Sequence, residues 1–157
     1  MQSSPLRKLA AKAEERKRKG IKVYHLNIGQ PDLPTAPIVF ETIHNLDQLT
    51  LAYAPSAGLM PALTAWKNYF HYVGIEFDEK EMVVTAGGSE AIIFALCAVC
   101  DNDDEIIVFE PFYTNYNGFA TIADAKLRPV PLSIKNGFHV PPEKEIKKYI
   151  NGKTKGI

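Results

Sequence analysis

The sequence has few cysteines, no excess of charge of either sign and no long apolar run. Lys plus Arg and Asp plus Glu each number 18, so no net charge attracts the chain to nucleic acid or to an anionic membrane, and we expect neither as a partner. No apolar stretch approaches the roughly 18 residues of a membrane span. The first residues lead into a polar helix rather than the apolar core of a signal peptide. We therefore predict a cytoplasmic protein.

The two cysteines, Cys97 and Cys100, form a CxxC pair that is compatible with redox chemistry or with half of a zinc site. A zinc site would need two further ligands, and the sequence has neither a second CxxC nor a closely spaced histidine pair. A reactive CxxC gains thiolate character at a helix N-terminus. This pair ends an apolar helix, where the helix dipole and burial both disfavour the thiolate. We predict two buried structural thiols and no metal site.

The chain does contain an alternation of strand and helix signals. With 46% apolar and 23% charged residues, it can form a domain with a substantial core. Ser4 is expected to cap the first helix. The periodicities predict helices over about 5–19, 37–46, 60–72 and 142–150 and after Ser89 and Tyr113, and strands over 22–28, 82–84, 105–109, 126–132 and from 153 onward. This order predicts an α/β fold with helices packed on a mostly parallel sheet.

The segment 82–111 has the pattern of a phosphate-binding βαβ unit: a strand, a glycine turn, a buried helix, an acidic loop and a second strand. Gly87 and Gly88 are expected to permit a tight turn with positive φ and to let a ligand approach the backbone. Ser89 is expected to cap the helix that follows. The unpaired N–H groups and the positive dipole end of that helix favour a bound phosphate.

A stripe of large side chains occupies the predicted helix 60–72 and its end. Trp66, Tyr69, Phe70 and Val73 recur at helical spacing, and all but Val73 are aromatic. Such a stripe is typical of a core or a subunit interface rather than of a cofactor-binding surface.

Four motifs occur in order along the chain: Asn27-Ile-Gly-Gln-Pro-Asp32, Tyr53-Ala-Pro-Ser-Ala-Gly-Leu59, Thr85-Ala-Gly-Gly-Ser-Glu-Ala91 and Glu110-Pro-Phe-Tyr-Thr-Asn-Tyr116. Together they resemble the N-terminal half of class I/II aminotransferases, in the aspartate-aminotransferase-like branch of the fold-type-I pyridoxal phosphate enzymes. The resemblance covers essentially the whole sequence. It implies the N-terminal part of the large domain of that fold.

The resemblance implies pyridoxal 5′-phosphate as the cofactor. Gly87, Gly88 and Ser89 would hold its phosphate through backbone N–H groups and the serine hydroxyl. Tyr113 matches the family's aromatic residue that stacks on the pyridine ring, and Phe112 is the alternative for this role.

Two further roles and a domain division follow from the same resemblance. Gly29 would leave room for the substrate carboxylate beside its backbone. Tyr53 would reach the cofactor phosphate of a neighbouring subunit, which implies a homodimer. Residues 1–34 would form an arm on the small-domain side, and residues 35–157 an incomplete cofactor-binding large domain.

The family's Schiff-base lysine would lie beyond Ile157, so we expect no catalytic residue in this chain and no turnover by these 157 residues alone. Lys80, Lys126 and Lys153 lie in polar settings that would not lower an amine pKa. The complete protein is expected to transfer an amino group between an amino acid, aspartate-like or aromatic, and a 2-oxo acid. The alternatives are a related fold-type-I lyase or synthase, or a truncated non-catalytic phosphate-binding protein.

Overall fold

The computed structural model describes residues 5–26 and 28–157, so the predicted cap Ser4 and the motif residue Asn27 lie outside the described residues. The chain divides into two compact units. We name them the sheet unit, formed mainly by Thr85–Ile157, and the helical unit, Leu9–Val84. The sheet unit also includes the described residues up to Lys8, so residues of the first helix, α1 (Pro5–Arg18), fall in both units.

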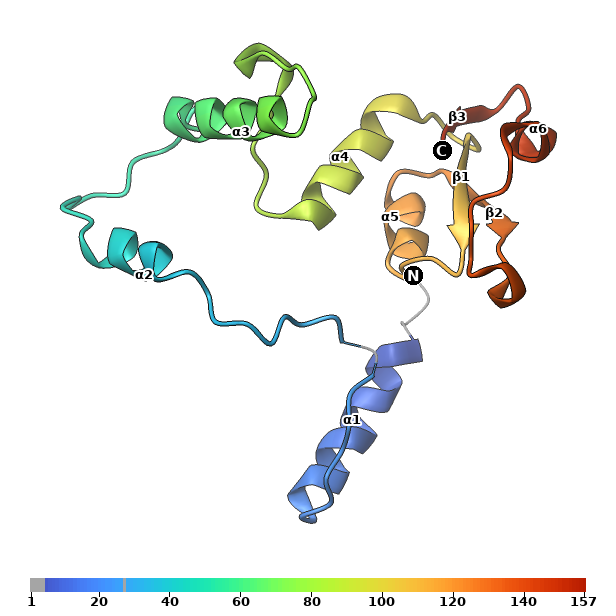
Figure 1. Ribbon diagram of the computed structural model, residues 1–157, viewed down its shortest axis with the longest axis horizontal. Helices are drawn as coiled ribbons and strands as arrows, with labels where there is room; N and C mark the ends of the chain where they lie inside the picture. The colour runs from blue at the N-terminus through green and yellow to red at the C-terminus, as the bar shows by residue number, and fades with distance from the viewer. Residues whose placement is uncertain (1–4, 27) are drawn as a thin grey trace. The chain divides into compact units, whose positions relative to one another are not determined.

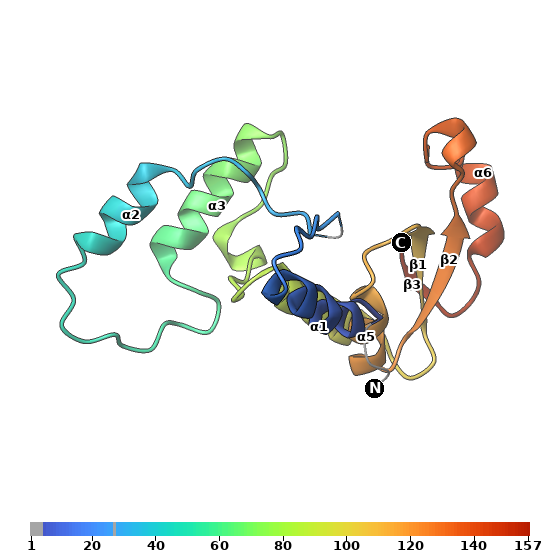
Figure 2. The same ribbon diagram turned by 90° about the horizontal axis from the view of Figure 1, so that it is seen from below.

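The sheet unit is built on three parallel strands in the order β2-β1-β3. Its elements are α4 (Gly88–Val99), β1 (Glu105–Glu110), α5 (Tyr116–Ile122), β2 (Lys126–Pro131), the 3₁₀ helix η2 (Ile134–Asn136), α6 (Glu143–Ile146), the 3₁₀ helix η3 (Lys147–Tyr149) and β3 (Thr154–Gly156). Glu105 of β1 pairs with Lys126 of β2 and with Thr154 of β3. The two views place α5 and α6 on opposite sides of the strands (Figure 1, Figure 2). The predicted α/β class with a parallel sheet is confirmed.

The core of the sheet unit centres on Ile107 in the middle of β1, which is only 1% exposed. Leu96 of α4, Phe119 and Ala120 of α5 and Val130 of β2 are buried as well. A strand that is flanked by parallel neighbours and covered by helices favours a continuous apolar run, and the Ile-Ile-Val-Phe sequence of β1 supplies one. The predicted strands at 105–109 and 126–132 are therefore confirmed.

Helix α4 is less buried than its apolar composition predicts. Leu96 is buried, but Phe94 is 52% and Val99 51% exposed. Cys97 is exposed, so the prediction of two buried thiols is wrong for this residue, because it lies on the uncovered side of the helix. Cys100 is half-buried, and burial raises the pKa of its thiol, as expected for an unreactive cysteine.

The helical unit contains α2 (Pro37–His44), α3 (Met60–Tyr72) and the 3₁₀ helix η1 (Glu79–Glu81). Helix α3 has the predicted limits. It ends where Gly74, at φ 82°, donates its N–H to His71 O, and Ile75 donates to Phe70 O. No helix in the ranges 5–26 and 28–157 is long and apolar enough to cross a membrane.

The aromatic stripe of α3 packs on itself rather than into a core. The rings of Trp66 and Tyr69 meet edge to face at 5.7 Å, and those of Phe70 and Phe77 at 5.4 Å. Trp66 is 49% and Tyr69 53% exposed. The stripe is therefore not a core within the described chain, and the subunit interface remains a prediction.

The strands predicted at 22–28 and 82–84 are wrong for the described residues, which are irregular there. Val84 N donates to Ala57 O at 2.8 Å, a single bond rather than a ladder. Gly58 permits this approach, because it has φ 113° and a Cβ at this position would lie 2.7 Å from Val84 Cγ2. A short apolar run forms a strand only beside a partner strand.

Candidate functional site

The N-terminal end of α4 exposes donors that an anion could use. Gly87 is the N-cap residue, and its carbonyl oxygen accepts from Glu90 N at 3.1 Å and from Ala91 N at 3.2 Å. No acceptor within the described ranges is recorded for the backbone N–H groups of Gly88 and Ser89. These N–H groups, at the positive end of a helix dipole, suit an anionic group.

The two glycines at this helix end leave open space beside the backbone, and neither is needed for a left-handed backbone conformation. Gly87 has an extended backbone at φ 168°, Gly88 is helical, and neither lies in the left-handed region that favours glycine, so the predicted positive-φ turn is wrong. A Cβ at either position would meet nothing within 4 Å. The chain itself therefore does not require glycine here, and the open space beside the backbone fits a phosphate in close approach.

The side-chain hydrogen bonds at this helix end involve Glu90 and Thr85 rather than Ser89. Ser89 is the second residue of the helix, so the prediction that it caps α4 is wrong. The Glu90 carboxylate accepts from Ala86 N at 2.6 Å, and Thr85 Oγ1 donates to Gly87 O at 3.0 Å. In a capping box, an acidic residue three positions after the N-cap accepts from the N-cap N–H, whereas Glu90 accepts from the residue before the N-cap. The charge of Glu90 opposes an anion, whereas the exposed hydroxyl of Ser89 can bind one.

A second candidate element, the aromatic segment 112–116, follows β1. Tyr113 is 55% exposed, and its ring meets that of Tyr116 edge to face at 5.9 Å. Its phenol oxygen accepts a hydrogen bond from Asn115 Nδ2. The sequence offered no signal for this contact beyond the proximity of the two residues.

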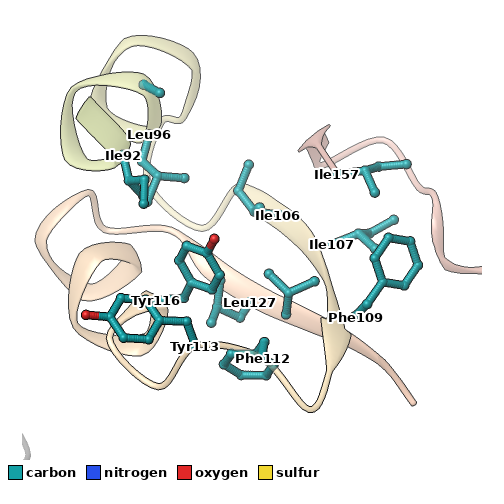
Figure 3. A pocket seen from close by; sticks show the side chains of 12 residues that line it. Ile92, Leu96, Ile106, Ile107, Phe109, Phe112, Tyr113, Tyr116, Leu127 and Ile157 are labelled. Carbon is teal, nitrogen blue, oxygen red and sulfur yellow. The ribbon is translucent and has the colours of Figure 1, made fainter. Parts of the chain in front are cut away.

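Tyr113 also lines an apolar pocket of about 520 Å³ within the sheet unit (Figure 3). Phe112, Tyr113 and Tyr116 lie at one side of this pocket, and Ile157 lies at the other. Ile92 and Leu96 bring α4 to its wall. Gly87, Gly88 and Ser89 do not line it, so the pocket and the helix end are separate features.

The remaining predicted site residues belong to the helical unit. Tyr53 is fully exposed in an irregular segment, and a Cβ at Gly29 would meet nothing within 4 Å. Gly87, Gly88, Ser89 and Tyr113 belong to the sheet unit.

Several charged groups of the described chain are paired at the surface. Lys126 binds Asp103, and that hydrogen bond raises the pKa of Lys126, whereas an imine-forming amine needs a lowered pKa. The Lys80 side chain is 80% exposed beside Asp78. In the part of the chain that the structure describes, no three His, Cys, Asp or Glu side chains gather as a metal site would require.

A model of the family "Aminotransferase class I and II" matches residues 21–157. The chain belongs to this family. The aspartate/prephenate aminotransferase of Thermus thermophilus is 31% identical over 149 residues, which are 94% of this chain and 38% of that protein. The aspartate aminotransferase of Pyrococcus horikoshii is 30% identical over 145 residues, or 91% of this chain and 37% of that protein. This aminotransferase chain thus spans about two fifths of the length of these relatives.

Solved aminotransferase structures share the fold of the chain. The structure of Thermus thermophilus aspartate aminotransferase with maleate superimposes with a TM-score of 0.87 at 30% identity and covers 98% of this chain and 41% of that one. The Thermotoga maritima aspartate aminotransferase gives a TM-score of 0.86 at 28% identity. The predicted family and its α/β fold are confirmed.

Proposed function

We propose that this chain supplies the cofactor-phosphate site of a pyridoxal 5′-phosphate-dependent aminotransferase. The complete protein transfers an amino group between an aspartate-like or aromatic amino acid and a 2-oxo acid. Bound pyridoxal phosphate supplies an electron sink for this chemistry. The observation that carries the proposal is the end of α4, where two N–H groups lack acceptors within the described ranges beside two glycines with open space.

The chain's own residues bind and orient the cofactor. The N–H groups of Gly88 and Ser89 and the Ser89 hydroxyl bind the phosphate, and the missing side chains of Gly87 and Gly88 let it approach. The Tyr113 ring provides a flat face that excludes water from one side of the pyridine ring. The proton-transferring groups are not among these residues, and the absence of turnover by this chain alone remains a prediction.

In this proposal, the helical unit contributes one residue beside the substrate and one at the interface between two subunits. Gly29 leaves space for the substrate carboxylate, and Tyr53 donates to the cofactor phosphate of the second subunit of a homodimer. The full exposure of Tyr53 supports a contact outside its own chain. The division into an arm of residues 1–34 and a cofactor domain of residues 35–157 remains a prediction.

The test is a titration of the chain with pyridoxamine 5′-phosphate, which has no aldehyde to react with exposed lysines, and with pyridoxamine as the reference. We expect the phosphorylated compound to bind more tightly. Gly88→Asp should weaken its binding on the order of tenfold, because a carboxylate then opposes the phosphate. The α4 helix should persist, because an acidic residue in the first turn is favourable.

The matched control is Gly88→Ala. It adds a Cβ into space that is open in the ligand-free chain and introduces no charge. The melting temperature of this variant should match that of the parent chain. Equal affinity of the parent for pyridoxamine and its phosphate, measured by fluorescence titration, would contradict the proposal.

A further inference from the structure

The hydrogen-bond partner of the Asn115 side chain is unusual for the position of this residue. Asn115 is the N-cap residue of α5, a position where asparagine normally accepts a hydrogen bond from the first helical N–H groups. Here it makes no side-chain capping bond. Its amide group Nδ2 instead donates to the phenol oxygen of Tyr113 at 2.5 Å. The side chain therefore contacts the proposed ring-stacking residue rather than its own helix.

The Tyr113 ring is held from several directions at once. Asn115 binds the phenol oxygen, and Tyr116 presents its ring edge to face at 5.9 Å with an interplanar angle of 82°. The Phe119 ring is also near, with its centroid 6.5 Å away and tilted at 59°. Because 55% of Tyr113 is exposed, packing alone leaves much of the ring free, and the hydrogen bond restrains its far end.

We propose that Asn115 is a positioning residue that holds the Tyr113 ring in one orientation before the cofactor binds. This inference rests on the proposed function, because the proposed function is what gives the Tyr113 ring its role in stacking. A ring that is already oriented loses less conformational freedom on binding, so the affinity for a flat pyridine ring rises. Asn115 itself need not touch the cofactor.

The experiment is a double-mutant cycle on the full chain, with pyridoxamine 5′-phosphate as the probe. Asn115→Ala should weaken binding about threefold to fivefold, the effect of losing one typical hydrogen bond. In the Tyr113→Phe background, which lacks the phenol oxygen, the same Asn115→Ala change should have little further effect. Equal effects of Asn115→Ala in both backgrounds would overturn the proposal.

Asn117→Ala is the matched control, because Asn117 lies in the same helix and its side-chain amide donates to the Thr114 carbonyl, not to a ring. It should leave binding unchanged. The NMR signals of the Tyr113 ring in the ligand-free chain provide an independent readout. The chemical shifts of these ring signals should change in Asn115→Ala, and the signals should average over several ring orientations. In Asn117→Ala the ring signals should stay unchanged.

The outcomes separate this inference from the proposed function. If Gly88→Asp weakens binding of the phosphorylated probe and Asn115→Ala does not, the positioning role is wrong and the phosphate site stands. If the parent chain does not prefer the phosphorylated probe, the proposed function fails. Unchanged Tyr113 ring signals in Asn115→Ala would overturn the positioning role in either case.

Discussion

The sheet unit and the helical unit are of similar length, but they bury their apolar side chains to different extents. In the sheet unit, β1, β2, α4 and α5 all contribute to a core around Ile107. In the helical unit, Leu63 is the buried apolar residue among those described, and the rings of α3 remain half exposed. Partner strands account for this difference. Strand β1 pairs with a strand on either side, whereas the apolar runs of the helical unit pair with no strand in the described chain.

The comparison shows that apolar composition alone does not specify a core. Helix α3 carries a continuous aromatic face, yet Trp66 and Tyr69 on it are half exposed, whereas the single residue Ile107 is almost fully buried. Burial requires that elements distant in sequence pack against each other, and the parallel pairing of β1 with β2 and β3 achieves this in the sheet unit.

The largest effect is expected at the centre of the sheet unit. Ile107→Ala should lower the free energy of unfolding by about 2–5 kcal/mol, because it removes buried methyl groups and leaves a cavity. Urea denaturation followed by circular dichroism measures this change. Leu63→Ala in the helical unit should cost less, because its exposed surroundings can collapse around the smaller side chain. Equal losses in the free energy of unfolding for Ile107→Ala and Leu63→Ala would contradict the difference in burial between the two units.

A smaller effect is expected in the helical unit at Gly58. Gly58→Ala should destabilise the chain by about 1–3 kcal/mol, because the backbone has positive φ and the new Cβ would clash with Val84. Hydrogen exchange at the Val84 amide, which donates to Ala57 O, should become faster. Gly118→Ala is the control, since a Cβ there meets nothing within 4 Å and lies within a helix. A slower or unchanged Val84 exchange in Gly58→Ala would refute this role.

The smallest effect concerns pH and the ion pairs of each unit. Hydrogen bonds from Arg128 and then Asn151 lower the pKa of Glu105 below its ordinary value near 4.5. Because the folded-state pKa is lowered, the stabilisation is present above the ordinary pKa and is lost as pH falls through the folded value. Melting temperatures between about pH 5 and pH 3 measure this loss, and Glu105→Gln should reduce it.

Glu79 in the helical unit provides the comparison for Glu105. A hydrogen bond from Lys67 lowers the pKa of Glu79, and Lys67 and Arg128 are about equally exposed, at 38% and 37%. The Glu79 side chain is itself more exposed than that of Glu105, 28% against 20%, so water screens its pair more. Glu79→Gln should therefore change the pH dependence less than Glu105→Gln. The reverse order would indicate that the helical unit has the more protected ion pair.

Local patterns predicted several elements well. The limits of α3 and the strand β1 follow from side-chain periodicity, a first-turn proline and a terminal glycine, all of which act within a few residues. The positions of the two glycines at the proposed phosphate site are also visible in the sequence. The reason for glycine at these positions was predicted only in part. Close approach of a ligand and a positive φ both favour glycine, and only the dihedral angles distinguish these two reasons.

The failures concern contacts between segments. The runs at 22–28 and 82–84 have strand-like composition, but composition does not reveal whether a partner strand lies alongside. The exposure of Cys97 depends on which side of α4 is covered, which helix periodicity cannot tell when the helix is apolar all round. The bond from Ala86 N to Glu90 was missed because Ser89 is the commoner residue type at a helix start.

The open space beside Gly87 and Gly88 has a consequence for how these positions tolerate variation. A library of variants sorted only for folded protein should accept alanine at both positions, since neither backbone is left-handed and no neighbouring atom opposes a methyl group. The same library sorted for binding of a phosphorylated ligand should return glycine. The two selections would therefore diverge most at a pair of residues that contribute nothing to the core.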